Sequence, residues 1–139
     1  MKINIAIDGP SAAGKSTIAK KLAKELGYAH LDTGAMYRCV GYYALQQKIN
    51  IDDEEALVHM MEYMQISFDA DGNVYINDQD VSKEIRQNEI SMVASKVSAF
   101  PKVRKHLVRL QQEMAKDKGY IMDGRDIGTI VLPDAELKI

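Results

Sequence analysis

The spacing of apolar residues at the start of the chain predicts a strand followed by a helix. Residues 3–8 (INIAID) alternate isoleucine with other residues, which is typical of a short strand, although Asn4 is unusual in a fully buried one. Residues 15–26 have apolar positions four apart with lysines between them, and Gly27 supplies a stop signal. The predicted apolar face of this helix consists of Ile18, Leu22 and Leu26.

A second strand and a second helix come next in the pattern. Residues 28–32 (YAHLD) favour a short strand. Asp32 or Thr33 can then cap a helix that begins near Gly34. The apolar face of that helix consists of Met36, Val40 and Ala44.

The period changes from helical to alternating in the middle of the chain. Asp52 and Glu55 have the spacing of a capping box for a third helix within residues 51–64. The apolar residues of this helix are Leu57, Val58, Met61 and Met64. Residues 66–76 then alternate on both sides of an Asp-Gly pair at 71–72, which predicts a β-hairpin.

The remaining pattern predicts two more helices and two more strands. A helical period returns over residues 82–97, and Pro101 suits the first turn of another helix, which Gly119 would end. The stripe of that last helix consists of Val103, Leu107, Leu110 and Met114. Residues 120–123 favour a strand, and residues 136–139 look like the beginning of another.

This alternation of strands and helices predicts an α/β fold with a parallel sheet covered by helices. We expect a single domain over residues 1–139, with the hairpin region, roughly residues 60–100, inserted as a lobe away from that sheet. Because the pattern stops at Ile139 inside a strand, we also expect the chain to be a fragment that lacks the C-terminal part of the core.

Composition and charge exclude several classes of protein. Charged residues make up 27% and the net charge is −2, so nothing attracts the whole chain to nucleic acid or to an anionic membrane. Cys39 is the only cysteine, which excludes an intrachain disulfide, and the three histidines lack ligand spacing. No signal peptide and no apolar stretch of about 18 residues is present. We therefore expect a cytoplasmic monomer that binds neither nucleic acid nor membrane.

The clearest motif is GPSAAGKS at residues 9–16, which fits G-x-x-x-x-G-K-[ST] at every fixed position. Its spacing lets backbone N–H groups surround a phosphate at the start of a helix, while Lys15 reaches the outer phosphates and the Ser16 hydroxyl can hold magnesium. A chance match is expected in about one in a few hundred chains of this length. The predicted residues for binding the nucleoside triphosphate are Gly9, Pro10, Ser11, Ala12, Ala13, Gly14, Lys15, Ser16 and Thr17.

Cationic side chains for a transferred phosphoryl group are few. Arg38 and Arg125 each follow the end of a predicted strand, where ligands bind in open α/β sheets. A solvated surface arginine is the alternative at both positions. Arg86 and Arg104 lie in predicted helical segments, where a structural role is as reasonable as a functional one.

Three polar residues at predicted strand ends complete the candidates. Asp123 ends the strand YIMD, so its carboxylate could orient magnesium through water, or it could simply cap the strand. Asp126 and Thr33 could contact a base or a sugar, on spacing alone.

With these residues in place, the sequence resembles the bacterial-type cytidylate kinases over residues 1–139. IAIDGPSAAGKST is similar to the phosphate loop of that family, and LDTGAMYR to its second motif. VSKEIR, ASKVSAFPKVR and MDGRDIGTIVLPDAELKI resemble its later blocks, in the same order. Several blocks in order are more specific than the phosphate loop, which many unrelated nucleotide enzymes share.

The resemblance implies a P-loop NTPase of the nucleoside monophosphate kinase fold. Its activity would be transfer of the γ-phosphoryl group of ATP to CMP or dCMP with Mg²⁺, and the inserted lobe would bind the monophosphate. The implied catalytic residues are Lys15, Arg38, Asp123 and Arg125, with Ser16 and, through water, Asp123 at the magnesium. The implied CMP-binding residues are Thr33, Arg38, Arg86, Ser95, Arg104, Arg125 and Asp126.

Two other functions stay open from the sequence. The family continues beyond this length with an arginine-bearing lid, which excludes water and brings cations to the phosphoryl group. A chain without it could be a non-catalytic nucleotide-binding fragment. The phosphate loop by itself also permits a kinase for another small acceptor, such as a different nucleoside monophosphate or shikimate.

Overall fold

The computed structural model describes residues 2–8, 13–124 and 127–139, which form two compact units. The first unit comprises Met1–Thr33, Phe68–Asn73 and Arg109–Ile139, and the second comprises Gly34–Ser67 and Val74–Val108. Each unit is built around its own sheet, one of four strands and one of three. The prediction of a single domain with a monophosphate-binding lobe at residues 60–100 stays a prediction.

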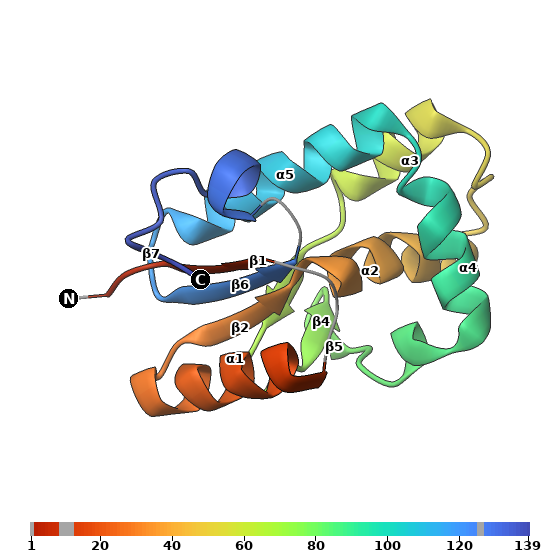
Figure 1. Ribbon diagram of the computed structural model, residues 1–139. Helices are drawn as coiled ribbons and strands as arrows, with labels where there is room; N and C mark the ends of the chain where they lie inside the picture. The colour runs from red at the N-terminus through yellow and green to blue at the C-terminus, as the bar shows by residue number, and fades with distance from the viewer. Residues whose placement is uncertain (1, 9–12, 125–126) are drawn as a thin grey trace. The chain divides into compact units, whose positions relative to one another are not determined.

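The first unit contains the predicted parallel sheet. Its strands are β1 (Ile5–Asp8), β2 (Ala29–Asp32), β6 (Tyr120–Gly124) and β7 (Leu137–Lys138), in the order β2-β6-β1-β7. All three neighbouring pairs of strands are parallel, which confirms the α/β fold class. Helix α1 (Ala13–Leu26) follows β1 and lies along one face of this sheet (Figure 1). The core between them contains Ile5, Ile7, Ala19, Ala23, Tyr28 and Ile121.

The predicted apolar face of α1 is wrong at two of its three positions. Ile18 is 57% exposed and Leu26 is 48% exposed, whereas Ala19 and Ala23 are completely buried. Leu22 is partly buried against the same core. Small alanine side chains let a helix approach a sheet closely. The face with Ala19 and Ala23 therefore packs against the sheet, and the larger Ile18 and Leu26 side chains remain exposed.

Asn4 is buried because its side chain replaces hydrogen bonds that water would otherwise make. Its Nδ2 donates to the carbonyl of Ala115 at 2.9 Å, and its Oδ1 accepts from the backbone N–H of Tyr120 at 3.4 Å. A buried polar group is tolerated when it is satisfied in this way. The polar residue that looked irregular in the strand pattern therefore ties the start of β1 to the end of α5 and to the first residue of β6.

The second unit contains five helical segments and a small sheet. The helical segments are α2 (Thr33–Gln46), α3 (Glu54–Met61), the 3₁₀ helix η1 (Glu84–Arg86), α4 (Asn88–Val97) and α5 (Pro101–Ala115). The first residue of α2 and the C-terminal part of α5 belong to the first unit. The sheet has the order β3-β4-β5, from β3 (Ile66–Phe68), β4 (Val74–Ile76) and β5 (Gln79–Asp80). Met36, Val40 and Ala44 are completely buried, which confirms the predicted face of α2.

The hairpin is confirmed, and the structure adds a strand that the sequence pattern missed. β3 and β4 are neighbours, and β5 pairs antiparallel with β4. Asn77 and Asp78 join β4 to β5 with φ values of 49° and 70°. Two consecutive residues with positive φ are typical of a tight two-residue hairpin turn, which asparagine and aspartate tolerate.

Two local helix predictions are wrong. The helix expected over residues 82–97 is divided, because Gln87 is extended with φ −65° and ψ 146° between η1 and α4. The cap of α3 is Asp53, whose side chain accepts from the N–H of Ala56 at 3.1 Å, and not Asp52. Asp52 instead forms an ion pair with Lys96 at 2.6 Å.

Candidate functional site

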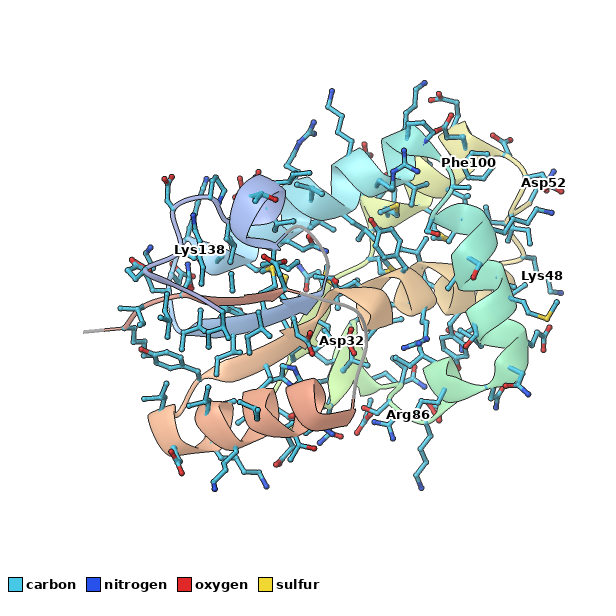
Figure 2. The ribbon with its side chains drawn as sticks, in the orientation of Figure 1. Asp32, Lys48, Asp52, Arg86, Phe100 and Lys138 are labelled. Atoms are coloured by element: carbon cyan, nitrogen blue, oxygen red, sulfur yellow. The ribbon has the colours of Figure 1, made fainter. Side chains whose placement is uncertain are left out.

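The candidate site lies where three parallel strands of the first unit end close to an aspartate. β1 ends at Asp8, β2 ends at Asp32, and Asp123 is the last residue but one of β6. The register places Asp123 opposite Ile7 on one side and opposite Asp32 on the other. Asp123 is only 5% exposed, and Asp32 is half-buried at the end of β2 (Figure 2). Ligands in open α/β sheets bind at this edge.

Asp32 is the residue that sequence reasoning missed as a site residue. The sequence predicts it only as a possible cap for the following helix. Residues directly opposite each other on neighbouring strands point to the same face, so the Asp32 and Asp123 carboxylates share one face at this edge. The signal that could have found Asp32 is its place at a strand end. That Asp32 lies opposite Asp123 depends on the β2–β6 register, which no local sequence pattern determines.

These two carboxylates fit a magnesium ion. Within residues 2–8, 13–124 and 127–139, no group of three histidine, cysteine or acidic side chains could hold a metal by itself. Mg²⁺ usually takes one or two carboxylates and completes its octahedron with water and substrate phosphate oxygens. Asp123 and Asp32 meet that requirement, together with the Ser16 hydroxyl that the sequence predicts.

The predicted phosphate loop connects β1 to α1. Gly9, Pro10, Ser11 and Ala12 lie outside the described residues, and the backbone from Ala13 to Thr17 forms the start of α1. The N–H groups in the first turn of a helix lack partners within the helix and carry a partial positive charge. Nucleotide phosphates bind at a helix N-terminus that follows a strand after a short connection. β1, residues 9–12 and α1 follow one another in this order.

Asp8 holds the segment that follows β6. Its Oδ1 accepts from the N–H of Ile127, and its Oδ2 accepts from the N–H of Gly128 at 3.0 Å. A Cβ at Gly128 would lie 3.1 Å from Asp8 Oδ2, so glycine permits this close approach. The π-helical turn Ile127–Val131 is therefore attached to the end of β1. Arg125 and Asp126 lie outside the described residues, between this anchor and the end of β6.

Thr33 has a structural contact at the same edge. Its hydroxyl donates to the carbonyl of Asp123 at 3.2 Å, and it is 9% exposed. A Cβ at Gly124 would collide with Thr33 Oγ1, so glycine is needed beside this hydroxyl. Thr33 thus ties the start of α2 to the end of β6, whatever contact it makes with a ligand.

The other predicted acceptor residues belong to the second unit. Arg38 is half-buried on α2, whereas Arg86 and Ser95 are exposed. The Ser95 hydroxyl donates to the carbonyl of Ser91 at 3.2 Å within α4. The structure places Thr17, Thr33 and Asp123 in one unit and Arg38, Arg86 and Ser95 in the other.

Arg104 caps the C-terminus of α4. Its Nη1 donates to the carbonyls of Ser98 and Ala99, at 3.1 and 3.2 Å. A cationic side chain is favourable at a helix C-terminus, where carbonyls lack partners. Burial raises the pKa of the nearby Tyr37 phenol, and the positive charge of Arg104 partly opposes that rise.

Cys39 takes no part in this chemistry. It is completely buried on α2, and burial raises the pKa of its thiol to about 12. A thiol that stays protonated is a poor nucleophile and a poor metal ligand.

The first unit thus defines a class of protein. A central parallel sheet, a glycine-rich connection from β1 to α1 and a carboxylate at the end of a neighbouring strand are the parts of an α/β nucleotide-binding protein of the P-loop type. Among the described residues, no helix is both long enough and apolar enough to cross a membrane.

Comparison with known proteins identifies the family. The family model described as cytidylate kinase matches residues 5–139. The chain is 54% identical to the cytidylate kinase of Streptococcus mutans over 144 residues, covering 100% of the chain and 63% of that relative. It is 56% identical to the cytidylate kinase of Caldicellulosiruptor bescii over 141 residues, covering 99% and 62%. The chain belongs to the cytidylate kinase family, and it spans a little under two thirds of the length of these relatives.

Proposed function

We propose that the protein transfers the γ-phosphoryl group of ATP to CMP or dCMP, giving ADP and CDP or dCDP. The observation that carries the proposal is the acidic edge that Asp32 and Asp123 form at the ends of β2 and β6, in a chain of the cytidylate kinase family. We also propose that the protein acts as a cytoplasmic monomer on these small substrates.

The proposed mechanism is in-line transfer without a covalent intermediate. The acceptor phosphate is already a nucleophile, so no side chain of this chain need act as a strong base. Residues 9–17 would hold the ATP phosphates, and Lys15 would stabilise the charge that develops on the transferred group. When bound, Mg²⁺ would neutralise phosphate charge. Ser16 and, through water, Asp123 would hold that ion.

The acceptor side would be provided by the arginines and polar residues that the sequence predicts. Arg38, Arg86, Arg104 and Arg125 would surround the phosphate of CMP, since the guanidinium fork suits bidentate phosphate contacts. Thr33, Ser95 and Asp126 would contact the nucleoside. Arg104 uses one nitrogen for two carbonyls of its own unit, so its remaining N–H groups would be the ones offered to phosphate.

The test is a steady-state assay with ATP and each of CMP, dCMP, UMP and AMP, on the protein with its natural ends. We expect CMP or dCMP to give the highest kcat/KM, and a clear preference for AMP or UMP would contradict the proposal. Arg125→Ala should raise the KM for CMP or lower kcat while leaving ATP binding intact. Arg109→Ala removes an exposed arginine of α5 and is the matched control.

A second candidate is a non-catalytic nucleotide-binding chain. The coverage of 62–63% of the relatives' length favours it for the 139 residues themselves. Calorimetry with ATP, followed by a search for CDP after CMP is added, separates the two functions. Binding of ATP without formation of CDP would support the second candidate.

A further inference from the structure

His30 is a buried histidine for which the phosphoryl-transfer mechanism above has no role. It lies on β2, two residues before Asp32, and is 2% exposed. Neither ring nitrogen has a hydrogen-bond partner among the described residues. A buried polar group without a partner is unfavourable and calls for a specific explanation.

The Asp123 carboxylate lies close to this ring. His30 Nε2 lies 3.7 Å from Asp123 Oδ2. The register explains the approach. His30 and Asp32 are two residues apart on β2 and therefore point to the same face of the sheet, and Asp123 points to that face from β6. An ordinary N–H···O bond would need this distance to shorten by only about 0.8 Å.

The turn of the first hairpin keeps the ring in this position. The backbone N–H of His30 donates to the carbonyl of Asp69 at 3.1 Å. Gly72 covers the opposite side of the ring, where an added Cβ would lie 3.2 Å from Nδ1, and its φ is +80°. The turn therefore covers Nδ1, while Nε2 faces a carboxylate oxygen, which accepts hydrogen bonds.

We propose that His30 is a positioning residue for Asp123. The ring carries a hydrogen on Nε2, and this N–H donates a hydrogen bond to Asp123 Oδ2 that fixes the orientation of the carboxylate. Outer partners of this kind orient metal-binding carboxylates in other proteins. The inference deepens the proposed function and rests on it for the role of Asp123.

The first test reads the ring itself and needs neither metal nor activity. The ¹⁵N chemical shifts of His30 in the 139-residue chain report which ring nitrogen carries the proton. We expect the Nε2–H form, and a shift of the Nε2 signal on Asp123→Asn. A ring protonated on Nδ1, or an Nε2 signal that Asp123→Asn does not move, would overturn the inference.

The second test uses two substitutions of equal length. His30→Gln keeps an N–H donor near Nε2, whereas His30→Met fills a similar volume without one. Leu31→Met changes the next residue, which is fully buried on the opposite face of β2, and is the control for disturbing the strand. The measured quantities are the half-saturating Mg²⁺ concentration, kcat, and the KM for CMP.

His30→Met should raise the half-saturating Mg²⁺ concentration roughly tenfold, with the KM for CMP within about twofold of the original. His30→Gln should restore most of the Mg²⁺ response, and Leu31→Met should leave it unchanged. Equal responses of the Gln and Met variants would reduce His30 to a filling side chain and overturn the proposal. If no CMP kinase activity is found at all, the proposed function fails. The ¹⁵N chemical shifts of the His30 ring then still show whether His30 contacts Asp123.

Discussion

Replacing Asp8 by alanine should release the turn that follows β6 from the end of β1. Both carboxylate oxygens of Asp8 accept backbone N–H groups, from Ile127 and Gly128, across more than a hundred residues of sequence. Hydrogen bonds to a charged group contribute about 1.5–3 kcal/mol each, and water competes at an exposed carboxylate such as this one. We therefore expect about 1 kcal/mol for each bond and about 2 kcal/mol in total.

The assay is amide hydrogen exchange, which reads local opening at each residue. A loss of about 2 kcal/mol corresponds to exchange that is about 30-fold faster at Ile127 and Gly128. Asp8→Asn keeps one acceptor oxygen, so its effect should be about half as large in free energy. Urea unfolding, followed in parallel, separates a local release from loss of the whole fold.

Glu113→Ala is the matched control. It also removes an exposed carboxylate from the first unit, where Glu113 pairs with Lys116 at 3.1 Å on α5. Pairs of this kind contribute within about 0.5 kcal/mol. If exchange at Ile127 and Gly128 stays within twofold in Asp8→Ala, or changes equally in Glu113→Ala, then Asp8 does not anchor this turn.

Three further predictions concern other residues. Gly41→Ala should lower the unfolding temperature by an amount equivalent to about 1–3 kcal/mol. The reason is that a Cβ there would lie 2.9 Å from Val93 Cγ1, where α4 crosses α2 (Figure 1). An unchanged melting curve would contradict this. Glu136 has its pKa lowered from 4.5 to about 2, chiefly by the N–H of Asn4, so its contribution to stability is present above pH 4.5 and is lost as the pH falls towards 2. Denaturant titrations of Glu136→Gln should accordingly show a weaker pH dependence in that window, and identical profiles would count against the contact. Cys39 should react with a thiol reagent at pH 8 only after unfolding, and rapid labelling of the native protein would show that the thiol is accessible.

The sequence predicted what depends on local period and missed what depends on register or close packing. The face of α2 follows from spacing because one buried face dominates it, and the strands of the parallel sheet follow from their short apolar runs. The face of α1 did not follow, since hydrophobicity favours Ile18 and Leu26 while close approach to the sheet favours Ala19 and Ala23. Asp32 needed the β2–β6 register, which joins residues about ninety positions apart.

The three carboxylates at the ends of β1, β2 and β6 differ in what their strand positions allow them to do. Asp8 ends β1, and both of its oxygens accept backbone N–H groups, so it serves as an anchor. Asp32 and Asp123 face each other across the β2–β6 pair, on the side of the sheet that α1 covers. Gly9, which follows β1 in the sequence, begins the predicted phosphate loop. We therefore assign mechanical attachment to the end of β1 and propose ion binding between β2 and β6.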